Sequence, residues 1–434
     1  MDLDLLGHQP ALHRLYTHVC LVHGRADGAA ALLRNGLDAL AASFPWLAGR
    51  VCHDTADAGV TGTYRIVRTD AIPLIECDLR ARALAVADLC PAGFPIRLLD
   101  ETVLAPCRTF NPPGQHAGLV AETGPVFAVQ LNLLVDGVVL TFAGQHNAMD
   151  MVGQAAVMRW LAQACRGQAP DADAVAVGNS DRTRTVPLVP DGDFAQLERP
   201  LKRRPPAPPG DTLWAYVSLS AAAVRALKAE ATADALAATG VDFVSSDDVV
   251  SAFIWRSVAR ARLARLNPST LSTLARAVDA RPALGVSPLY PGALSNMVYA
   301  QKSLDGLLAE PLGATAGDLR RLLSPPAIAR ATRELATYIS QRRGVQRVAV
   351  AAAVDPTTGV MLSSWAKLGL YDLDFGLGRP LAVRRPRSAP VEGLGYVMPR
   401  AADGATVVAL CLRSDDWDRL GCDAGWTASV SFLG

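Results

Sequence analysis

The sequence has little of what marks secreted, membrane-spanning or nucleic-acid-binding proteins. None of its eight cysteines forms a Cys-x-x-Cys pair, so we expect reduced core residues and not a disulfide framework or a zinc site. No run of about 18 apolar residues lacks a charge, and the acidic N-terminus does not resemble a secretory signal. The formal net charge of +1 gives no long-range attraction to nucleic acid or to an anionic membrane. These absences predict a soluble, cytoplasmic protein.

The motifs of several common enzyme classes are also missing. There is no P-loop, no G-x-S-x-G and no G-x-G-x-x-G, so nucleotide hydrolysis, serine hydrolysis and dinucleotide chemistry lose support. Asp374-Phe375-Gly376 resembles the magnesium-binding triplet of protein kinases, but the other kinase motifs are absent. His146 and Asp150 supply at most two metal ligands and no His-x-x-x-His is present, so no metal site is expected.

The composition is that of an ordered globular protein with more than one core. Hydrophobic residues make up 50% of the 434 residues and charged residues 19%. A chain of this length is expected to form two domains of roughly 200 residues each. Residues 171–211 lack sustained periodicity and carry seven prolines, which predicts a crossover linker. We therefore predict one domain over residues 1–170 and a second over residues 212–434.

The stretch from residue 126 to residue 153 predicts a β-hairpin followed by a helix. Two apolar runs flank Asp136-Gly137, the strongest short-range signal for a tight two-residue turn. His146 follows the end of the second strand, and residues 151–165 have the apolar density of a buried helix. A strand-end imidazole with an ordinary pKa of about 6.5 suits a general base. Asp150 could orient this imidazole, or it could turn away and pair with a cation.

Further helices and strands follow from the same kinds of pattern. Helices are expected over residues 29–43, 221–237 and 249–266, and the last of them has a serine cap and first-turn acids. Strands are expected over residues 12–22, 63–67, 94–98, 213–219, 273–279 and 297–300. A second hairpin around Asp403-Gly404 precedes a helix from about residue 414. It has Arg413 and Ser414 where the first has its histidine, so one catalytic centre is expected.

Two motifs together resemble those of the BAHD acyltransferases. Residues 146–150, HNAMD, match the HxxxD motif, and residues 374–378, DFGLG, resemble DFGWG 228 positions later (374 − 146). Residues 44–50, 245–255, 278–281 and 363–365 resemble further family blocks. Residues 6–22 and 382–386 are most similar to the fungal branch that contains trichothecene 3-O-acetyltransferase. Leu377 in place of Trp and Met151 in place of Gly depart from the usual motifs.

This resemblance implies an α/β fold and an acyl transfer. The fold would consist of two chloramphenicol-acetyltransferase-like domains, each a mixed β-sheet with helices, and the active-site channel would lie at their interface. The protein would be a monomeric O-acyltransferase that uses acyl-CoA, by the fungal resemblance acetyl-CoA, as co-substrate and a terpenoid or polyketide-type alcohol as acceptor, without a bound cofactor or metal. An N-acyltransferase, a condensation-type enzyme and a non-catalytic CoA-binding relative remain alternatives. Gln145 stands where condensation domains carry a further histidine.

The resemblance also implies roles for individual residues. His146 would be the general base, and the Trp365 N–H or the Ser363 hydroxyl would stabilise the oxyanion. Asp150 would pair with Arg281 and hold the loop. The residues expected to be structural in the second motif are Asp374, Gly376 and Gly378. The residues expected to hold acyl-CoA are Ser245, Ser246, Arg384 and Arg385. The run from Arg384 to Arg387 could equally be a solvated loop.

Overall fold

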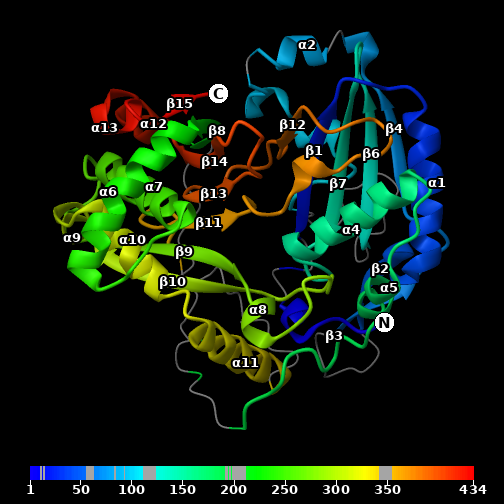
Figure 1. The fold of residues 1–434 in the computed structure, drawn as a ribbon, viewed down its shortest axis with the longest axis horizontal. Coiled ribbons are helices and arrows are strands. Elements are labelled where there is room, and N and C mark those ends of the chain that lie inside the picture. The colour runs from blue at the N-terminus through cyan, green and yellow to red at the C-terminus, as the bar shows by residue number, and fades with distance from the viewer. Residues whose placement is uncertain are drawn as a thin grey trace.

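The chain forms two lobes that lie side by side. The computed structural model describes residues 1–9, 12, 15–54, 63–82, 85–91, 93–110, 124–190, 194, 197, 212–341 and 354–434. The N-terminal half, blue to cyan, makes one lobe, and the C-terminal half, green to red, makes the other (Figure 1). Each lobe is a β-sheet with helices packed on it, as the sequence predicts.

The N-terminal lobe is built on a five-stranded sheet of order β12-β1-β7-β6-β4, with a three-stranded sheet β3-β2-β5 beside it. Its strands are β1 (Tyr16–His23), β2 (Gly49–Asp54), β3 (Thr63–Arg68), β4 (Leu74–Asp78), β5 (Gly124–Pro125), β6 (Phe127–Leu133) and β7 (Val138–Gln145). Its helices are α1 (Ala29–Ser43), α2 (Val86–Leu89), α3 (Glu101–Leu104), α4 (Met151–Cys165) and α5 (Ala172–Gly178), with 3₁₀ turns η1 (Leu5–His8), η3 (Pro45–Ala48), η4 (Arg80–Arg82) and η5 (Ile96–Leu98). Helices α1 and α4 pack together on the outer side of the large sheet (Figure 1).

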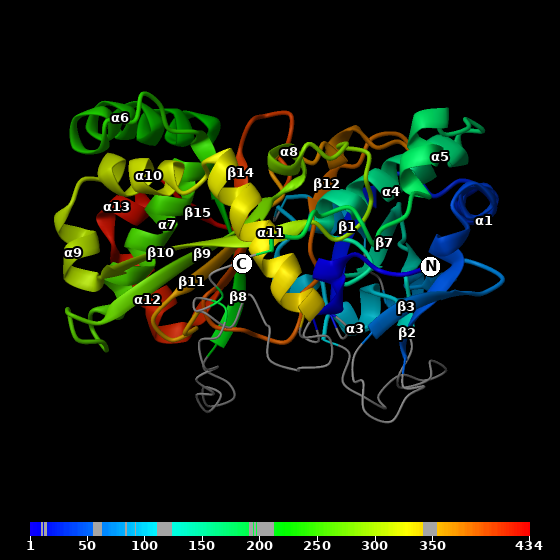
Figure 2. The ribbon, with the colours of Figure 1, turned by 90° about the horizontal axis from the view of Figure 1, so that it is seen from below.

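The C-terminal lobe is built on a seven-stranded sheet of order β10-β9-β11-β13-β14-β8-β15. Its half of the chain supplies β8 (Thr212–Leu219), β9 (Leu271–Asp279), β10 (Ser295–Ser303), β11 (Val360–Ser364), β12 (Ala382–Arg384), β13 (Leu394–Val397), β14 (Thr406–Arg413) and β15 (Ser431–Phe432). The helices are α6 (Ala221–Thr239), α7 (Ser246–Arg262), α8 (Arg281–Leu284), α9 (Leu304–Ala309), α10 (Leu312–Arg321), α11 (Pro325–Gln341), α12 (Ser414–Cys422) and α13 (Ala424–Thr427), with the 3₁₀ turn η7 (Leu370–Asp372). Figure 2 shows α6 and α10 stacked on one side of this lobe. No helix in the described ranges has the length and apolar composition needed to cross a bilayer.

The predicted hairpin of residues 126–153 is confirmed, but its turn lies one residue earlier than expected. Strands β6 and β7 are antiparallel, and the Leu134 N–H donates to Gly137 O at 2.9 Å. This bond continues the ladder, so the two turn residues are Val135 and Asp136. A Cβ atom on Gly137 would lie 2.2 Å from His23 O, which explains why glycine is required there. The second hairpin, β13 and β14 followed by α12, is also confirmed.

Three sequence predictions about local structure were wrong. Residues 94–98 are not a strand, because Phe94 has a φ of 57° and Pro95 lacks an N–H, and the chain forms η5 instead. Helix α7 ends at Arg262 and continues as turns, four residues before the expected end. The stretch 171–211 is not wholly irregular, since it begins with α5. Most of its remainder, residues 191–211 except 194 and 197, lies outside the described residues.

The cysteines are all free, but they are not all core residues. Cys20, Cys107, Cys165 and Cys411 are buried, whereas two others, Cys90 and Cys422, are exposed. The expectation that all of them pack in the core was therefore wrong, and their reduced state stays a prediction.

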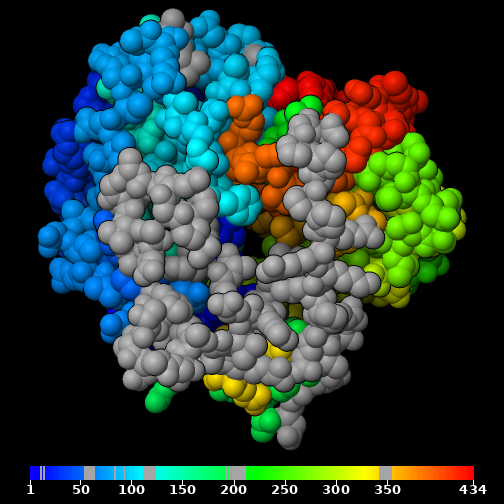
Figure 3. Space-filling model, turned by 180° about the vertical axis from the view of Figure 1, so that it is seen from behind, coloured from blue at the N-terminus to red at the C-terminus, as the bar shows by residue number. Residues whose placement is uncertain are grey.

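One strand of the C-terminal half crosses into the N-terminal lobe. Strand β12 pairs with β1, with Cys20 opposite Arg384 and Val22 opposite Ala382. On the face seen in Figure 3, the orange segment that contains this strand lies between the cyan N-terminal lobe and the red C-terminal end. The division of the chain at residues 170 and 211 stays a prediction, and β12 shows that the lobes do not follow the chain order strictly.

The DFGLG segment fixes the course of the chain just before β12. The Asp374 carboxylate accepts the N–H groups of Gly376 and Gly378 at 2.8 and 2.9 Å. Both glycines have positive φ, 87° and 79°, which favours glycine over any other residue. The ring of Phe375 is fully buried and stacks on Phe142 of β7 at 5.2 Å. These contacts support a structural role for the motif.

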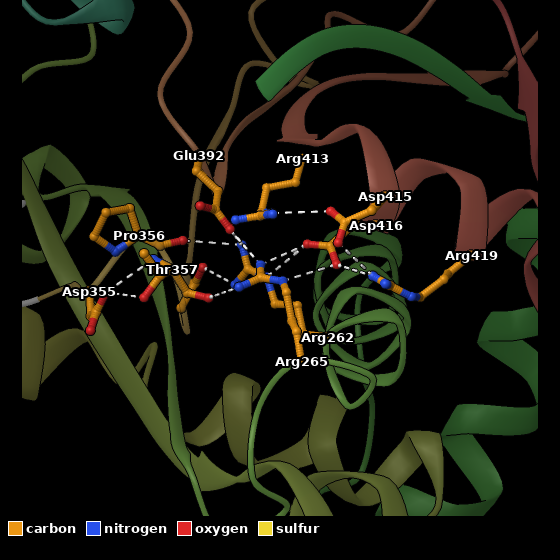
Figure 4. Close-up of polar contacts among 11 residues, drawn as sticks. Arg262, Arg265, Asp355, Pro356, Thr357, Glu392, Arg413, Asp415, Asp416 and Arg419 are labelled. Carbon is orange, nitrogen blue, oxygen red and sulfur yellow. Dashed lines mark hydrogen bonds and ion pairs between the residues drawn. The ribbon is translucent and has the colours of Figure 1, made fainter. Parts of the chain in front are cut away.

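A network of buried charges ties α7 to the loops of the C-terminal lobe (Figure 4). Asp416 is fully buried and accepts hydrogen bonds from Arg265 at 2.8 Å and Arg419 at 3.2 Å. Arg262 donates to Gly359 O at 2.7 Å and lies 3.3 Å from the Glu392 carboxylate. The network therefore joins three segments that are far apart in the sequence.

We expect Asp416→Ala to lower the free energy of unfolding by about 3 kcal/mol, because Arg262 and Arg265 then share a single buried carboxylate, that of Glu392. Denaturant unfolding followed by tryptophan fluorescence measures the loss. Asp415→Ala is the matched control, since that carboxylate pairs with Arg413 and Arg419 at the surface and is worth about 1 kcal/mol or less. Equal losses of unfolding free energy in Asp416→Ala and Asp415→Ala would show that burial of the carboxylate does not determine its contribution.

Candidate active site

His146 lies at the first turn after β7, as the sequence predicts. Its backbone N–H donates to Leu15 O at 2.9 Å, which fixes the residue to the segment before β1. The residue keeps part of its surface accessible, whereas its Nδ1 atom is buried without a hydrogen-bond partner among the described residues. Burial lowers the pKa of His146, and its own carbonyl and the charge of Asp150 only partly offset this, while Arg385 lowers it further. The imidazole is therefore neutral at neutral pH, as a general base must be.

Asp150 turns away from His146 and pairs with Arg281. Two hydrogen bonds of 2.9 and 3.0 Å join the carboxylate to the guanidinium, and both side chains are buried. The same carboxylate accepts the Gly153 N–H at 2.9 Å, as the N-cap of α4, and the Leu294 N–H at 2.8 Å. Although burial alone would lower the pKa of Arg281, its interactions with Asp150 and Asp279 raise it. The pair locks the loop of His146 against the C-terminal lobe.

A second arginine, Arg182, contacts the same loop. Arg182 is buried, donates to Ala148 O at 2.7 Å and stacks over the ring of Trp46 at 4.1 Å. It also lies 3.9 Å from the Asp4 carboxylate. Arg182 could not be predicted from the sequence, because it falls in the expected linker and its partners are far away in the chain.

Ser363 and Trp365 form a hydrogen-bonded pair at the end of β11. The indole N–H donates to Ser363 Oγ at 3.1 Å. Trp365 is only 2% exposed, and its backbone N–H donates to Val397 O at 2.8 Å. With its oxygen accepting from the indole, the hydroxyl of Ser363 keeps its own proton to donate. The two predicted oxyanion donors are thus neighbours, and Trp365 orients Ser363.

The residues expected to hold acyl-CoA are spread over two places. Ser245 is the N-cap of α7, and its hydroxyl is engaged with Asp248 in a capping box. Ser246 follows it as the first residue of the helix. Arg384 and Arg385 are buried, so the alternative of a solvated loop was wrong for them. Arg384 donates to Gly93 O at 2.8 Å, which gives its guanidinium a structural partner.

A buried polar cluster, unpredicted from the sequence, lies between the lobes. His18 forms a hydrogen bond with Thr109 Oγ1 at 3.1 Å and contacts Cys107 Sγ at 3.6 Å. Burial lowers the pKa of His18 to about 3, with a further contribution from Arg385, although the Glu101 carboxylate lies 3.8 Å away. That carboxylate accepts the Thr109 N–H at 2.8 Å. Burial also raises the pKa of Cys107, so the thiol is not a nucleophile.

A cavity of about 990 Å³ opens between the lobes, and we call it the interface cavity. It is lined by Arg97, Asp100, Glu101, Thr102, Arg108, Phe110, Thr212, Leu213, Trp214, Arg387, Ser388, Ala389, Pro390, Phe432 and Gly434. His146 is not among these lining residues, but it is linked to one of them, because Phe110 pairs with Leu15, whose carbonyl accepts the His146 N–H. Both lobes therefore contribute to one cavity, and two backbone contacts separate its lining from His146.

Another lining residue, Trp214, is linked through Tyr396 to the hydrogen-bonded pair of Ser363 and Trp365. Three aromatic rings follow one another at centroid distances of 6.0 and 5.1 Å, those of Trp214, Tyr396 and Trp365. The lining of the cavity is thus linked, through intervening residues, to a neutral histidine on one lobe and to hydrogen-bond donors on the other. This arrangement can take a proton from a hydroxyl and stabilise a developing oxyanion. In the described part of the chain, no three His, Cys, Asp or Glu side chains gather to hold a metal ion.

Comparisons with known proteins identify the same chemistry. Residues 15–165 match the trichothecene 3-O-acetyltransferase-like N-terminal domain, and residues 110–420 match the Transferase family. The chain is 43% identical to trichothecene 3-O-acetyltransferase of Saccharomyces cerevisiae, over 100% of this chain and 96% of the relative. It is 40% identical to the trichothecene 3-O-acetyltransferase TRI101 of Fusarium sporotrichioides, over 100% and 97%.

The fold agrees with these relatives. The crystal structure of F. graminearum TRI101 with coenzyme A and T-2 mycotoxin superposes with a TM-score of 0.94 at 39% identity, covering 100% of this chain and 99% of that one. The predicted α/β fold and the resemblance to BAHD acyltransferases are therefore confirmed. The chain belongs to the Transferase family, in its trichothecene 3-O-acetyltransferase-like branch, and is an acyltransferase.

Proposed function

We propose that this protein transfers the acetyl group of acetyl-CoA to a hydroxyl of a polycyclic secondary metabolite, as a cytoplasmic monomer. The observation that supports the proposal is the neutral His146 at the end of β7, on a loop that Asp150 joins to Arg281 of the other lobe. The presence of coenzyme A in the structure of a relative 39% identical supports CoA as the co-substrate. Trichothecene alcohols are the first acceptors to consider, because two relatives of at least 40% identity are named for them.

The mechanism follows from the geometry of the site. His146 accepts the proton of the acceptor hydroxyl as its oxygen attacks the thioester carbonyl, and no acyl-enzyme forms. Ser363, oriented by Trp365, donates to the carbonyl oxygen while that oxygen carries negative charge. The C–S bond then breaks, and the sulfur of CoA takes the proton from the imidazolium. Asp150 and Arg281 hold the loop and take no part in proton transfer.

The proposal is tested with purified protein, acetyl-CoA and a panel of acceptors. Deoxynivalenol and T-2 toxin represent trichothecenes, and polyketide alcohols and primary amines represent the alternatives. Thiol release and the mass of the acylated product are followed together. We expect a gain of one acetyl group on a hydroxyl. Acylation of the amines alone would favour an N-acyltransferase, and CoA binding without turnover on any acceptor would favour a non-catalytic relative.

The rim of the interface cavity carries an exposed aromatic side chain that we expect to contact the acceptor. Phe432 is 65% exposed although it is large and apolar, which suits contact with an apolar ring system. We expect Phe432→Ser to raise KM for the acceptor roughly 5- to 30-fold, from about 1 to 2 kcal/mol of lost apolar burial. KM for acetyl-CoA is expected to stay unchanged. Leu236→Ser, at a residue of α6 that is 56% exposed, is the control and should change neither constant. A change in KM for acetyl-CoA alone would assign the cavity to CoA.

A further inference from the structure

Arg385 is a buried cation that pairs with no carboxylate in the described part of the chain. The residue is only 2% exposed, and its Nε atom is buried without a hydrogen-bond partner among the described residues. Nη2 donates to Thr109 Oγ1 at 3.3 Å, a neutral partner. Removing an ion from water without a counter-charge is unfavourable. The burial of this charge therefore indicates that Arg385 meets an anion that the described residues do not supply.

The guanidinium is fixed beside the proposed oxyanion donors. It lies over the ring of Tyr396 at 4.2 Å and 5.9 Å from the centroid of Trp365. The backbone of Arg385 is held on both sides by Tyr216, whose hydroxyl donates to Arg385 O at 2.8 Å and accepts the Arg385 N–H at 2.6 Å. Because its main chain and its side chain are both held, the charge has a defined position.

The same guanidinium also lies close to the segment that carries His146. Thr109, which accepts from Arg385, uses its carbonyl to accept the Tyr16 N–H at 2.9 Å. The preceding residue, Leu15, accepts the His146 N–H at 2.9 Å. The electrostatic effect agrees with this geometry: after burial, the pKa of His146 responds to Asp150, which raises it, and to Arg385, which lowers it. Arg385 thus lies between His146 and the hydrogen-bonded pair of Ser363 and Trp365.

Building on the proposed acetyl transfer, we propose that Arg385 is a further catalytic residue, which contacts the thioester of bound acetyl-CoA and stabilises the negative charge formed there. As the acceptor oxygen bonds to the carbonyl carbon, its proton passes to His146 and the π electrons of the carbonyl move to its oxygen. When the C–S bond breaks, its electron pair goes to sulfur, which then takes the proton. A fixed cation in a site with little water stabilises both anionic forms.

The test compares Arg385→Gln, which removes the charge, with Arg385→Lys, which keeps it. With acetyl-CoA and deoxynivalenol, we expect kcat to fall about 10²-fold in Arg385→Gln, with both KM values little changed. Arg385→Lys is expected to recover part of the loss, because the charge returns without the planar fork. The acid limb of the pH profile moves to higher pH in Arg385→Gln, since the pKa of His146 rises when the cation is removed.

Arg256→Gln is the matched control, because that guanidinium is partly buried on α7 and donates only to backbone carbonyls, those of Leu307 and Glu310. Its kcat and acid limb should stay unchanged. A wild-type kcat in Arg385→Gln would overturn the proposal, as would a loss confined to KM for the acceptor. A lower kcat with an unmoved acid limb and a lower melting temperature would leave only a structural role.

Two measurements distinguish a failure of the proposed acetyl transfer from a failure of the proposed role of Arg385. If the wild-type protein releases no thiol with any acceptor, the proposed function is wrong. The titration of His146, followed by NMR of labelled histidine and assigned with His146→Gln, still tests the charge. We expect its pKa to rise in Arg385→Gln, and an unchanged titration would exclude any electrostatic effect of Arg385 on the site.

Discussion

His146→Ala is expected to lower kcat for acetyl transfer by about 10²- to 10⁴-fold, the range that general-base assistance supplies. The physical reason is the position of His146 at the end of β7, where Leu15 O accepts its backbone N–H, together with its lowered pKa. Two other histidines, His18 and His23, cannot replace it without a change of fold, because they are fully buried in the sheet. The measurement is thiol release at saturating acetyl-CoA, with KM for each substrate expected to change much less than kcat.

The pH dependence of the wild-type protein follows from the same group. Only the neutral imidazole accepts a proton, so activity falls as pH drops through the pKa of His146. Burial places this pKa below the ordinary value of about 6.5. We therefore expect kcat/KM to be constant from pH 8 to about pH 6.5 and to decline only at lower pH. A decline that begins above pH 7 would contradict a neutral, buried base.

The variant His8→Ala is the control, because it removes an imidazole that is not the proposed base. His8→Ala removes a side chain that accepts the Tyr64 N–H at 3.1 Å in the N-terminal lobe, and it should leave kcat within about twofold. Full acetyl transfer by His146→Ala would contradict the mechanism. The mechanism would also be contradicted if His146→Ala lost kcat together with a large fall in melting temperature, and if His8→Ala lost kcat equally.

The position of His146 could be predicted because its cause is local. An apolar strand that ends in small and polar residues, followed by an apolar helix, places the histidine at a strand end whatever the rest of the fold does. The structure has β7 end at Gln145 and α4 begin at Met151, as the pattern indicates. The orientation of Asp150 is different, since its partner Arg281 is 131 positions away. That pairing came from family resemblance and not from spacing.

Asp136-Gly137 correctly predicts the hairpin, but the two residues are needed there for reasons other than the turn type. Asp136 is a turn residue, and its carboxylate also accepts the N–H groups of Val86 and Ala87 at 2.6 and 2.9 Å, at the start of α2. Gly137 is outside the turn and is needed because β1 passes close to it. The two residues mark the hairpin, but a contact between distant segments explains each of them.

The polar cluster of His18 could not be predicted, because it is assembled from three distant segments. His18 comes from β1, Glu101 and Thr109 come from the region of α3, and Arg385 follows β12. In the sequence His18, Glu101 and Thr109 have no neighbours that suggest a site, and Arg385 is noticed only as part of a basic run. Their meeting depends on β12 crossing to the N-terminal sheet, a pairing that follows from the DFGLG segment and its contacts with β7.

Asp150→Ala is expected to lower the free energy of unfolding by about 3 to 5 kcal/mol, because it leaves Arg281 buried without its main counter-charge. The variant also loses the N-cap of α4, worth about 1 kcal/mol, and an acceptor for the Leu294 N–H. Activity falls with stability, since the loop of His146 is no longer held. Denaturant unfolding and thiol release, measured on the same preparation, give both quantities.

Two further variants decide whether Asp150 acts through Arg281. Asp279→Ala removes the other carboxylate on the same guanidinium, but that side chain is 32% exposed, so a loss of about 1 kcal/mol or less is expected. The double variant Asp150→Ala with Arg281→Met removes both buried charges, and it should be more stable than Asp150→Ala alone. Because His146 still needs a fixed loop, this stabilisation should restore little activity. If Asp150→Ala instead lost turnover at unchanged stability, Asp150 would act directly on His146 and the pairing with Arg281 would be incidental.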